Sequence, residues 1–174
     1  SPEVDGLGES AFYGCSALTN ISPRTFNKIT QVKTQLFYGC SALDGELSFP
    51  EAISLGSRSF YSTAVLDKIS VSSKLEAIYS ECLRYSGISV FEPEELPELT
   101  VIDAGGMAQM PNLKGNFVFP KLEVLNGFNQ STNIESVTAV NAKSIAANAF
   151  KNCSNLKFVD FNPALTNIST SAFY

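Results

Sequence analysis

Apolar residues recur along this chain in short runs with fixed internal steps. The first run advances in steps of three, at Phe12, Cys15, Leu18 and Ile21. Later positions advance in steps of two, as from Ile69 to Val71. Steps of three are typical of a short helical turn, and steps of two are typical of a β-strand. The pattern therefore predicts a unit in which a short helical turn leads into a short strand.

These runs are copies of one sequence unit. The segment Phe12-Tyr-Gly-Cys-Ser-Ala-Leu18 recurs without change at residues 37–43, and a variant of it occupies residues 150–156. We call the first residue of each copy its anchor, and weaker copies have their anchors at Phe60, Leu83, Met107, Phe128 and Phe173. About 23 residues separate successive anchors. A unit this short cannot bury its own apolar face, whereas stacked units form a continuous core.

Two further features complete the unit, which we call a coil. A second apolar segment precedes most anchors, as at residues 53–55 and 101–102, and predicts a strand that closes the coil from the other side. Two coils carry one extra residue and share the pattern Leu-x-Gly-x-apolar-x-Phe-Pro, at residues 43–50 and 113–120. The glycine of this pattern predicts a β-bulge where the residue is gained. The chain is therefore expected to be a single domain over residues 1–174, a β-rich solenoid of parallel short strands with short helical turns.

The best-preserved copies resemble a known family. Ala11-Phe12 to Ile21, Ala149-Phe150 to Val159 and the return segment Leu165 to Phe173 are similar to the BspA-type leucine-rich repeats of bacterial surface proteins. The similarity is weaker between about residues 60 and 135, where other residues replace the Ala-Phe anchor. The resemblance implies a right-handed leucine-rich-repeat solenoid of about seven repeats, part of a longer protein at the cell surface or secreted. It also implies adhesion to host proteins or other cells, and its motif contains no catalytic residues.

The composition excludes several kinds of chemistry. The chain has no His, so it cannot contain a Ser-His-Asp triad, a His-ligated metal or a His proton shuttle. Its formal net charge of −5 disfavours nucleic acid and anionic lipid as partners, because the long-range electrostatic contribution would be repulsive. No apolar run is long enough to span a bilayer, so direct membrane insertion of this segment is not expected. No cofactor is expected either.

The four cysteines have a structural interpretation and a minor alternative. Cys15, Cys40 and Cys153 share one repeat position that is expected to point inward, where Cys acts as a small buried hydrophobe. Cys82, just before its anchor, is expected to be buried too. The alternative is a disulfide between Cys15 and Cys40, which neighbouring coils would bring close together. The acidic segment Glu92–Glu98 is expected to be a solvated corner rather than a calcium site, because it lacks the spacing of a calcium-binding loop.

Two surfaces are candidate partner sites. The outward positions of the long strands are mostly small and polar, with Val90, Val118 and Phe158 as exposed apolar exceptions, and with charged candidates at Lys68, Glu92 and Asp160. The other surface is an external row of aromatic rings at Tyr13, Tyr38 and Tyr61. An ordinary solvated β-face and a purely stabilising stack of rings are the respective alternatives.

Three functional hypotheses follow. The first is a non-catalytic binding or adhesion module whose β-sheet face contacts a protein, or a glycan, such as a host extracellular protein or another cell-surface protein. The second is a passive spacer in a larger surface protein. An enzyme acting on polysaccharide, with Glu46 and Glu92 as its carboxylates, is the least favoured because few loops are available to build a site. Since the terminal coils lack polar caps, either a longer natural protein or end-to-end self-association is expected.

Overall fold

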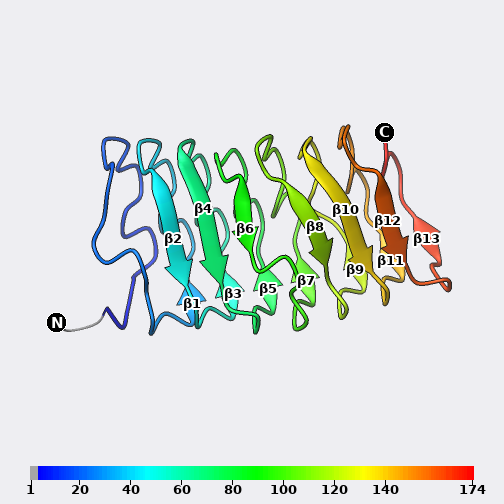
Figure 1. The fold of residues 1–174 in the computed structure, drawn as a ribbon, viewed down its shortest axis with the longest axis horizontal. Coiled ribbons are helices and arrows are strands. Elements are labelled where there is room, and N and C mark those ends of the chain that lie inside the picture. Colours follow the sequence, from blue (N-terminus) through cyan, green and yellow to red (C-terminus); the bar gives the residue numbers. More distant parts are fainter. Residues whose placement is uncertain (1–3) are drawn as a thin grey trace.

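The computed structural model describes residues 4–174 and shows an elongated solenoid (Figure 1). Residues 1–3 of the predicted domain lie outside the described part. One side of the solenoid carries the longer strands β2 (Gly45–Phe49), β4 (Leu66–Val71), β6 (Val90–Glu92), β8 (Gly115–Val118), β10 (Ile134–Ala139) and β12 (Phe158–Phe161). The other side carries two-residue strands: β1 (Gln31–Val32), β3 (Ser54–Leu55), β5 (Ala77–Ile78), β7 (Val101–Ile102), β9 (Val124–Leu125), β11 (Ser144–Ile145) and β13 (Asn167–Ile168).

Strands of successive coils pair side by side and in parallel. The longer strands form two sheets in the orders β2-β4-β6 and β8-β10-β12, and the short strands form two more in the orders β1-β3-β5-β7 and β9-β11-β13. Residues at the same repeat position pair with each other, as Ile69 does with Phe91. The predicted solenoid of parallel short strands is confirmed, including the second strand that closes each coil.

The core runs through the interior between the two sets of strands. Its anchor residues stack along the solenoid axis, with Phe37 lying 5.0 Å from Phe12 and 5.7 Å from Phe60 between ring centroids. A second stack joins Phe128 to Phe150 at 5.5 Å and continues to Phe173. Leu83 and Met107 are fully buried at the anchor positions between the two stacks. Because each anchor packs on the next, the repeat length of the sequence sets the register of the core.

The turns after each anchor are not helices, which corrects one predicted detail. Consecutive i to i+3 hydrogen bonds do form, since the Cys15 amide donates to the Phe12 carbonyl and the Leu18 amide donates to the Cys15 carbonyl. However, the residues two before and two after most anchors have a left-handed backbone, as at Arg58 with φ 54° and Ser62 with φ 57°. Left-handed residues interrupt a right-handed helix after a single turn. The spacing of three between apolar residues therefore reflects linked β-turns and not a helix.

The described residues contain six longer strands, whereas the sequence predicts about seven coils. The first coil lacks its long strand because a later segment pairs with β2. The Ser48 amide donates to the Arg24 carbonyl, and the Phe26 amide donates to the Ser48 carbonyl. Residues 24–26 thus lie beside β2, although the apolar spacing seen in the other coils would place residues 20–22 there.

Both coils with an extra residue contain the predicted irregularity. Gly45 has φ 70° and Gly115 has φ 139°, and the pairing register shifts at each glycine. A charged side chain of the preceding coil fills the space beside each shift. The Arg24 guanidinium donates to the carbonyls of Asp44 at 2.6 Å and Glu46 at 3.2 Å. At the second shift, the Glu94 carboxylate accepts a hydrogen bond from the Asn116 amide at 3.3 Å.

The second shift also divides the long-strand side into two sheets. The Val118 amide donates to the carbonyl of Glu94, and the Leu96 amide donates to the carbonyl of Val118. The segment after β6 therefore pairs with the end of β8, while β6 itself pairs only with β4. The result is an opening between β6 and the start of β8.

The cysteines follow the structural interpretation with one exception. Cys40, Cys82 and Cys153 are buried, but Cys15 is exposed, contrary to the burial predicted for it. It lies in the first described coil, where no earlier coil of the described chain packs on it. All four are free thiols, so the Cys15–Cys40 disulfide is not present. Burial raises the pKa of Cys40 and Cys153 to about 11 and that of Cys82 to about 12.

Candidate binding surfaces

The outward residues of the longer strands form two rows, which we call the sheet face. Strand pairing places one row at Glu46, Lys68 and Val90 on the first sheet, β2-β4-β6, and at Asn116, Ser136 and Phe158 on the second, β8-β10-β12. It places the other row at Ser48, Ser70, Glu92, Val118, Thr138 and Asp160. Outward positions alternate with buried ones along each strand, as the steps of two in the sequence predict. Every sheet candidate named from the sequence lies in these rows.

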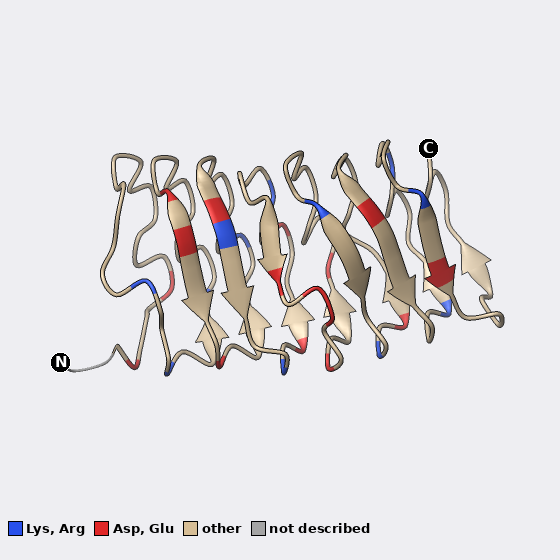
Figure 2. Cartoon of the chain, in the orientation of Figure 1, with Lys and Arg blue, Asp and Glu red and all other residues tan. Residues whose placement is uncertain are grey.

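The charged candidates on the first sheet bind one another. The Lys68 ammonium lies 2.8 Å from the Glu92 carboxylate and 3.9 Å from the Glu46 carboxylate. Figure 2 shows these charges as bands on the adjacent strands β2, β4 and β6. The hydrogen bond to Glu92 raises the pKa of Lys68, although partial burial of the amine opposes this shift. Lys68 therefore stays charged and links three neighbouring coils.

The apolar candidates are not gathered into one patch. Val90 is 37% exposed on the first sheet, and Phe158 is 58% exposed on β12, the last strand of the second sheet. Val118 is only half-buried and lies in the other row, beside Thr138 and in line with the half-buried Asp160. The prediction that Val118 is an exposed exception is therefore wrong, because the row of Asp160 is the more enclosed of the two on the second sheet.

A hollow of about 420 Å³ lies in the opening between β6 and β8. Val90 and Glu92 line it from β6, Glu94 lines it from the following corner, and Lys114 and Gly115 line it from the start of β8. Lys114 is therefore a functional candidate that the sequence did not indicate, and Glu94 was considered there only as part of the acidic corner at Glu92–Glu98. Their only signal was the extra residue at Gly115, whose effect on strand pairing is a matter of tertiary structure.

The tyrosine row is a stack of rings. Tyr13 lies 4.7 Å from Tyr38, and Tyr38 lies 4.9 Å from Tyr61, with interplanar angles of 5° and 6°. Tyr85 continues the row at 5.4 Å from Tyr61, but its ring is turned by 85°. Because the faces of the inner rings cover one another, this row presents mainly ring edges. A planar ligand has little ring face to stack on there.

A ladder of polar side chains continues from the tyrosine row. The Glu81 carboxylate accepts hydrogen bonds from Arg58 at 2.6 Å and from Arg84, whose guanidinium also binds the Gln109 side chain. Gln109 in turn donates to the Gln130 side-chain oxygen at 3.1 Å. Burial would raise the pKa of Glu81, but the hydrogen bonds from both arginines outweigh burial and lower it. The ladder therefore links consecutive coils through an ionised Glu81.

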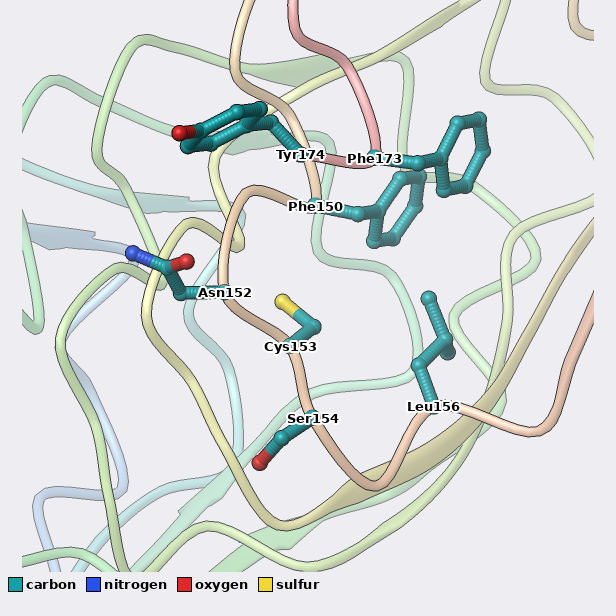
Figure 3. Close-up of a pocket in the computed structure, with 7 residues that line it drawn as sticks. All are labelled: Phe150, Asn152, Cys153, Ser154, Leu156, Phe173 and Tyr174. Carbon is teal, nitrogen blue, oxygen red and sulfur yellow. The ribbon is translucent and has the colours of Figure 1, made fainter.

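The last coil carries another hollow, shown in Figure 3. The stacked rings of Phe150 and Phe173 form part of it, and Tyr174 lies beside them with its ring 5.0 Å from the Lys151 ammonium. Phe173 is 47% exposed. This hollow is formed by the final residues of the sequence, so it carries no functional assignment, and end-to-end association stays a prediction.

Metal sites and membrane-spanning helices are both absent from residues 4–174. No group of three or more His, Cys, Asp and Glu side chains there has the arrangement of a metal site. In the same residues, no helix has the length and apolarity needed to cross a membrane.

Comparison with known proteins identifies the repeat. The model of the BspA type leucine rich repeat region matches six copies, over residues 5–125 and 124–174. The chain belongs to the BspA-type leucine-rich repeat family. This BspA-type chain also resembles the crystal structure of a leucine rich cell surface protein from Faecalibacterium prausnitzii, with a TM-score of 0.50 and 13% identity, over 88% of this chain and 68% of that one. At such low identity the likeness concerns the fold alone. No curated protein matches the chain.

Proposed function

We propose that this BspA-type chain is a non-catalytic binding module of a cell-surface or secreted protein, and that its sheet face contacts a protein partner. The family is a repeat scaffold, and a protein of the same fold is described as a cell surface protein. The sheet face supports the proposal because, within each of its two sheets, the outward residues of adjacent parallel strands stay in register. Such a surface suits a broad contact with another folded protein.

The hollow between β6 and β8 is the observation that carries the proposal. Val90 offers apolar surface at its rim, and Glu92, Glu94 and Lys114 supply charged groups around it. Binding energy in protein interfaces concentrates where a side chain of one partner fills a pocket of the other inside a polar rim. The hollow therefore fits an apolar side chain of the partner, flanked by a basic group that complements Glu94, since Glu92 is already paired with Lys68.

The carboxylates named for an enzyme support a structural role instead. Glu46 and Glu92 both approach the ammonium of Lys68, at 3.9 and 2.8 Å. They therefore act as ion-pair partners of one lysine across three coils. A glycosidase would require one carboxyl that is protonated and a second that is ionised, on opposite sides of a substrate cleft.

The spacer hypothesis is the second candidate, and the ion pairs between coils favour it. Lys121 lies 2.5 Å from Glu98, Lys143 lies 2.7 Å from Glu123, and Lys157 lies 2.9 Å from Glu135. Each pair joins neighbouring coils, so these charges hold the solenoid together and offer less to a partner. A spacer would need this internal cohesion and no recognition surface.

Binding to a panel of extracellular-matrix proteins separates the two functions. The test variant combines Val90→Ser, Val118→Ser and Phe158→Ser on the sheet face. The matched control combines Val101→Ser, Val124→Ser and Ile168→Ser, three residues on the short-strand side that are 37%, 47% and 53% exposed. We expect saturable binding that the control retains and the sheet-face variant loses by about tenfold or more. Equal binding by both variants would contradict the use of the sheet face, and no binding by any protein would favour the spacer.

A further inference from the structure

A second hollow, of about 380 Å³, opens among the turns that lead into the longer strands. Tyr85 and Ser86 line it from one coil, Gln109 and Asn112 line it from the next, and Gln130 lines it from the coil after that. Its size falls in the range of small-ligand sites. None of its residues belongs to the sheet face, so it is independent of the function proposed above.

Ser86 makes this hollow different from the equivalent turns of other coils. Its hydroxyl is the one buried side-chain polar atom without a hydrogen-bond partner among the described residues, and the residue is only 2% exposed. Buried polar groups in proteins are nearly always satisfied, since an unmet donor loses its bonds to water without compensation. Ser86 lines the hollow while its hydroxyl is covered, so a turn of the side chain toward the hollow would let a bound group satisfy it.

The repeat explains why Ser86 has no partner. In three other coils the residue at this position donates to the anchor carbonyl of the preceding coil: Cys40 to Phe12 at 3.0 Å, Ser131 to Met107 at 2.6 Å and Cys153 to Phe128 at 3.1 Å. For Ser86 the corresponding acceptor is the carbonyl of Phe60. That carbonyl already accepts the hydroxyl of Thr63 at 2.8 Å and the Thr63 amide at 3.4 Å. In the next coil, the same repeat position holds Met110, whose apolar side chain supplies no acceptor.

The lining indicates the chemistry of the ligand. It contains no Asp, Glu, Lys or Arg. The Tyr85 ring is 43% exposed, and the Arg84 guanidinium lies 4.9 Å from its centroid. Asn112 donates to the Gly87 carbonyl at 3.2 Å, and the Gln130 oxygen accepts from Gln109, so these amides are held in place. The Gln130 nitrogen has no hydrogen-bond partner within residues 4–174. An aromatic surface beside fixed amides and a hydroxyl suits a neutral ligand rich in hydroxyl groups.

We propose that this hollow binds a sugar ring of a neutral saccharide, with one apolar face on Tyr85 and its hydroxyls bonded to Ser86 and Gln130. The Ser86 hydroxyl is covered in the free protein, so it reaches the sugar by rotating about χ1 to another staggered conformation. The rotation is favourable because it replaces an unmet donor with a hydrogen bond.

The test measures binding of four soluble neutral hexasaccharides, namely maltohexaose, cellohexaose, mannohexaose and xylohexaose, by calorimetry and by saturation-transfer NMR. We expect at least one of them to bind with a dissociation constant of about 1 mM or tighter. Ser86→Ala and Tyr85→Ala should each weaken that binding by about tenfold. Ser131→Ala is the matched control, because Ser131 holds the same repeat position but its hydroxyl is already bonded to the Met107 carbonyl.

The melting temperature provides the second measurement. Without saccharide, Ser131→Ala should melt at a lower temperature, because it leaves a carbonyl without its hydroxyl donor, whereas Ser86→Ala should melt no lower than the parent protein. Weak binding by Ser86→Ala therefore cannot be ascribed to unfolding. The proposal is overturned if none of the four saccharides binds, if Ser86→Ala binds as tightly as the parent, or if Ser131→Ala loses as much affinity.

Discussion

The interior stack of anchor phenylalanines makes a quantitative prediction about stability. Phe37 is fully buried and lies between the rings of Phe12 and Phe60, at centroid distances of 5.0 and 5.7 Å. Replacing it with Ala removes a large buried side chain and leaves a cavity that the stacked coils above and below cannot easily close. Phe to Ala changes in protein cores cost about 3–5 kcal/mol in the free energy of unfolding.

Two comparison variants separate burial from ring stacking. Phe37→Leu keeps most of the buried volume, as Leu83 does naturally at the same repeat position, but loses both ring contacts. At roughly 0.5–1.5 kcal/mol for each aromatic pair, it should cost about 1–3 kcal/mol. Phe173→Ala removes a ring that is 47% exposed and stacks only on Phe150, so it should cost about 1–2 kcal/mol.

Urea unfolding followed by circular dichroism measures these differences. With a slope of about 2 kcal/mol per molar urea, Phe37→Ala should lower the midpoint by about 1.5–2.5 M, provided that the slope itself is unchanged. The reasoning would be refuted if Phe173→Ala were as destabilising as Phe37→Ala. It would also be refuted if Phe37→Leu cost as much as Phe37→Ala, because the whole loss of stability would then come from the lost ring contacts and none from the lost burial.

Two further predictions concern ionisable groups. In the native protein at about pH 8, a disulfide-exchange reagent should label Cys15 rapidly and the three buried thiols only after denaturant is added. The reason is that burial raises the pKa of Cys40, Cys82 and Cys153. Rapid labelling of more than one thiol per native chain would contradict this prediction. Glu81→Gln should lower the stability at neutral pH by no more than about 1 kcal/mol. The two arginines lower the pKa of Glu81, so its contribution is present above the normal carboxyl range and is lost as the pH falls through the lowered value. Thermal melts should therefore show a difference between variant and parent that shrinks toward acidic pH, and a difference that grew would refute the assigned charge state.

Much of the fold was predictable because each local feature of the sequence recurs in the next coil and packs on its copy there. Once the segment at Phe12–Leu18 is seen again at residues 37–43, each apolar position gains a partner in the next coil, and stacking follows from burial alone. The predicted helical turns were wrong because a step of three is shared by helices and by linked β-turns. The left-handed residues that decide between them, such as Arg58, Ser62 and Asn148, have no side chain that requires this conformation.

The candidate sites were predictable only in part. The two outward rows of the sheet face followed from alternation along the strands, and Lys68, Val90 and Glu92 lie where the steps of two place them. The hollow beside them did not follow from alternation. It depends on the pairing of β8 with the segment after β6, and therefore on hydrogen bonds between residues that lie more than 20 positions apart, such as those between Val118 and Glu94.

The sequence by itself determined the family, the repeat length, the buried anchors and the direction in which side chains point. These properties repeat about every 23 residues, so they can be recognised in several copies of the repeat. The tertiary structure decided where the repetition fails: the division between β6 and β8, the exposure of Cys15 and the unpartnered hydroxyl of Ser86. Each of these depends on which group of a neighbouring coil has already taken a hydrogen bond or covered a side chain. That competition between coils is decided only when they are stacked.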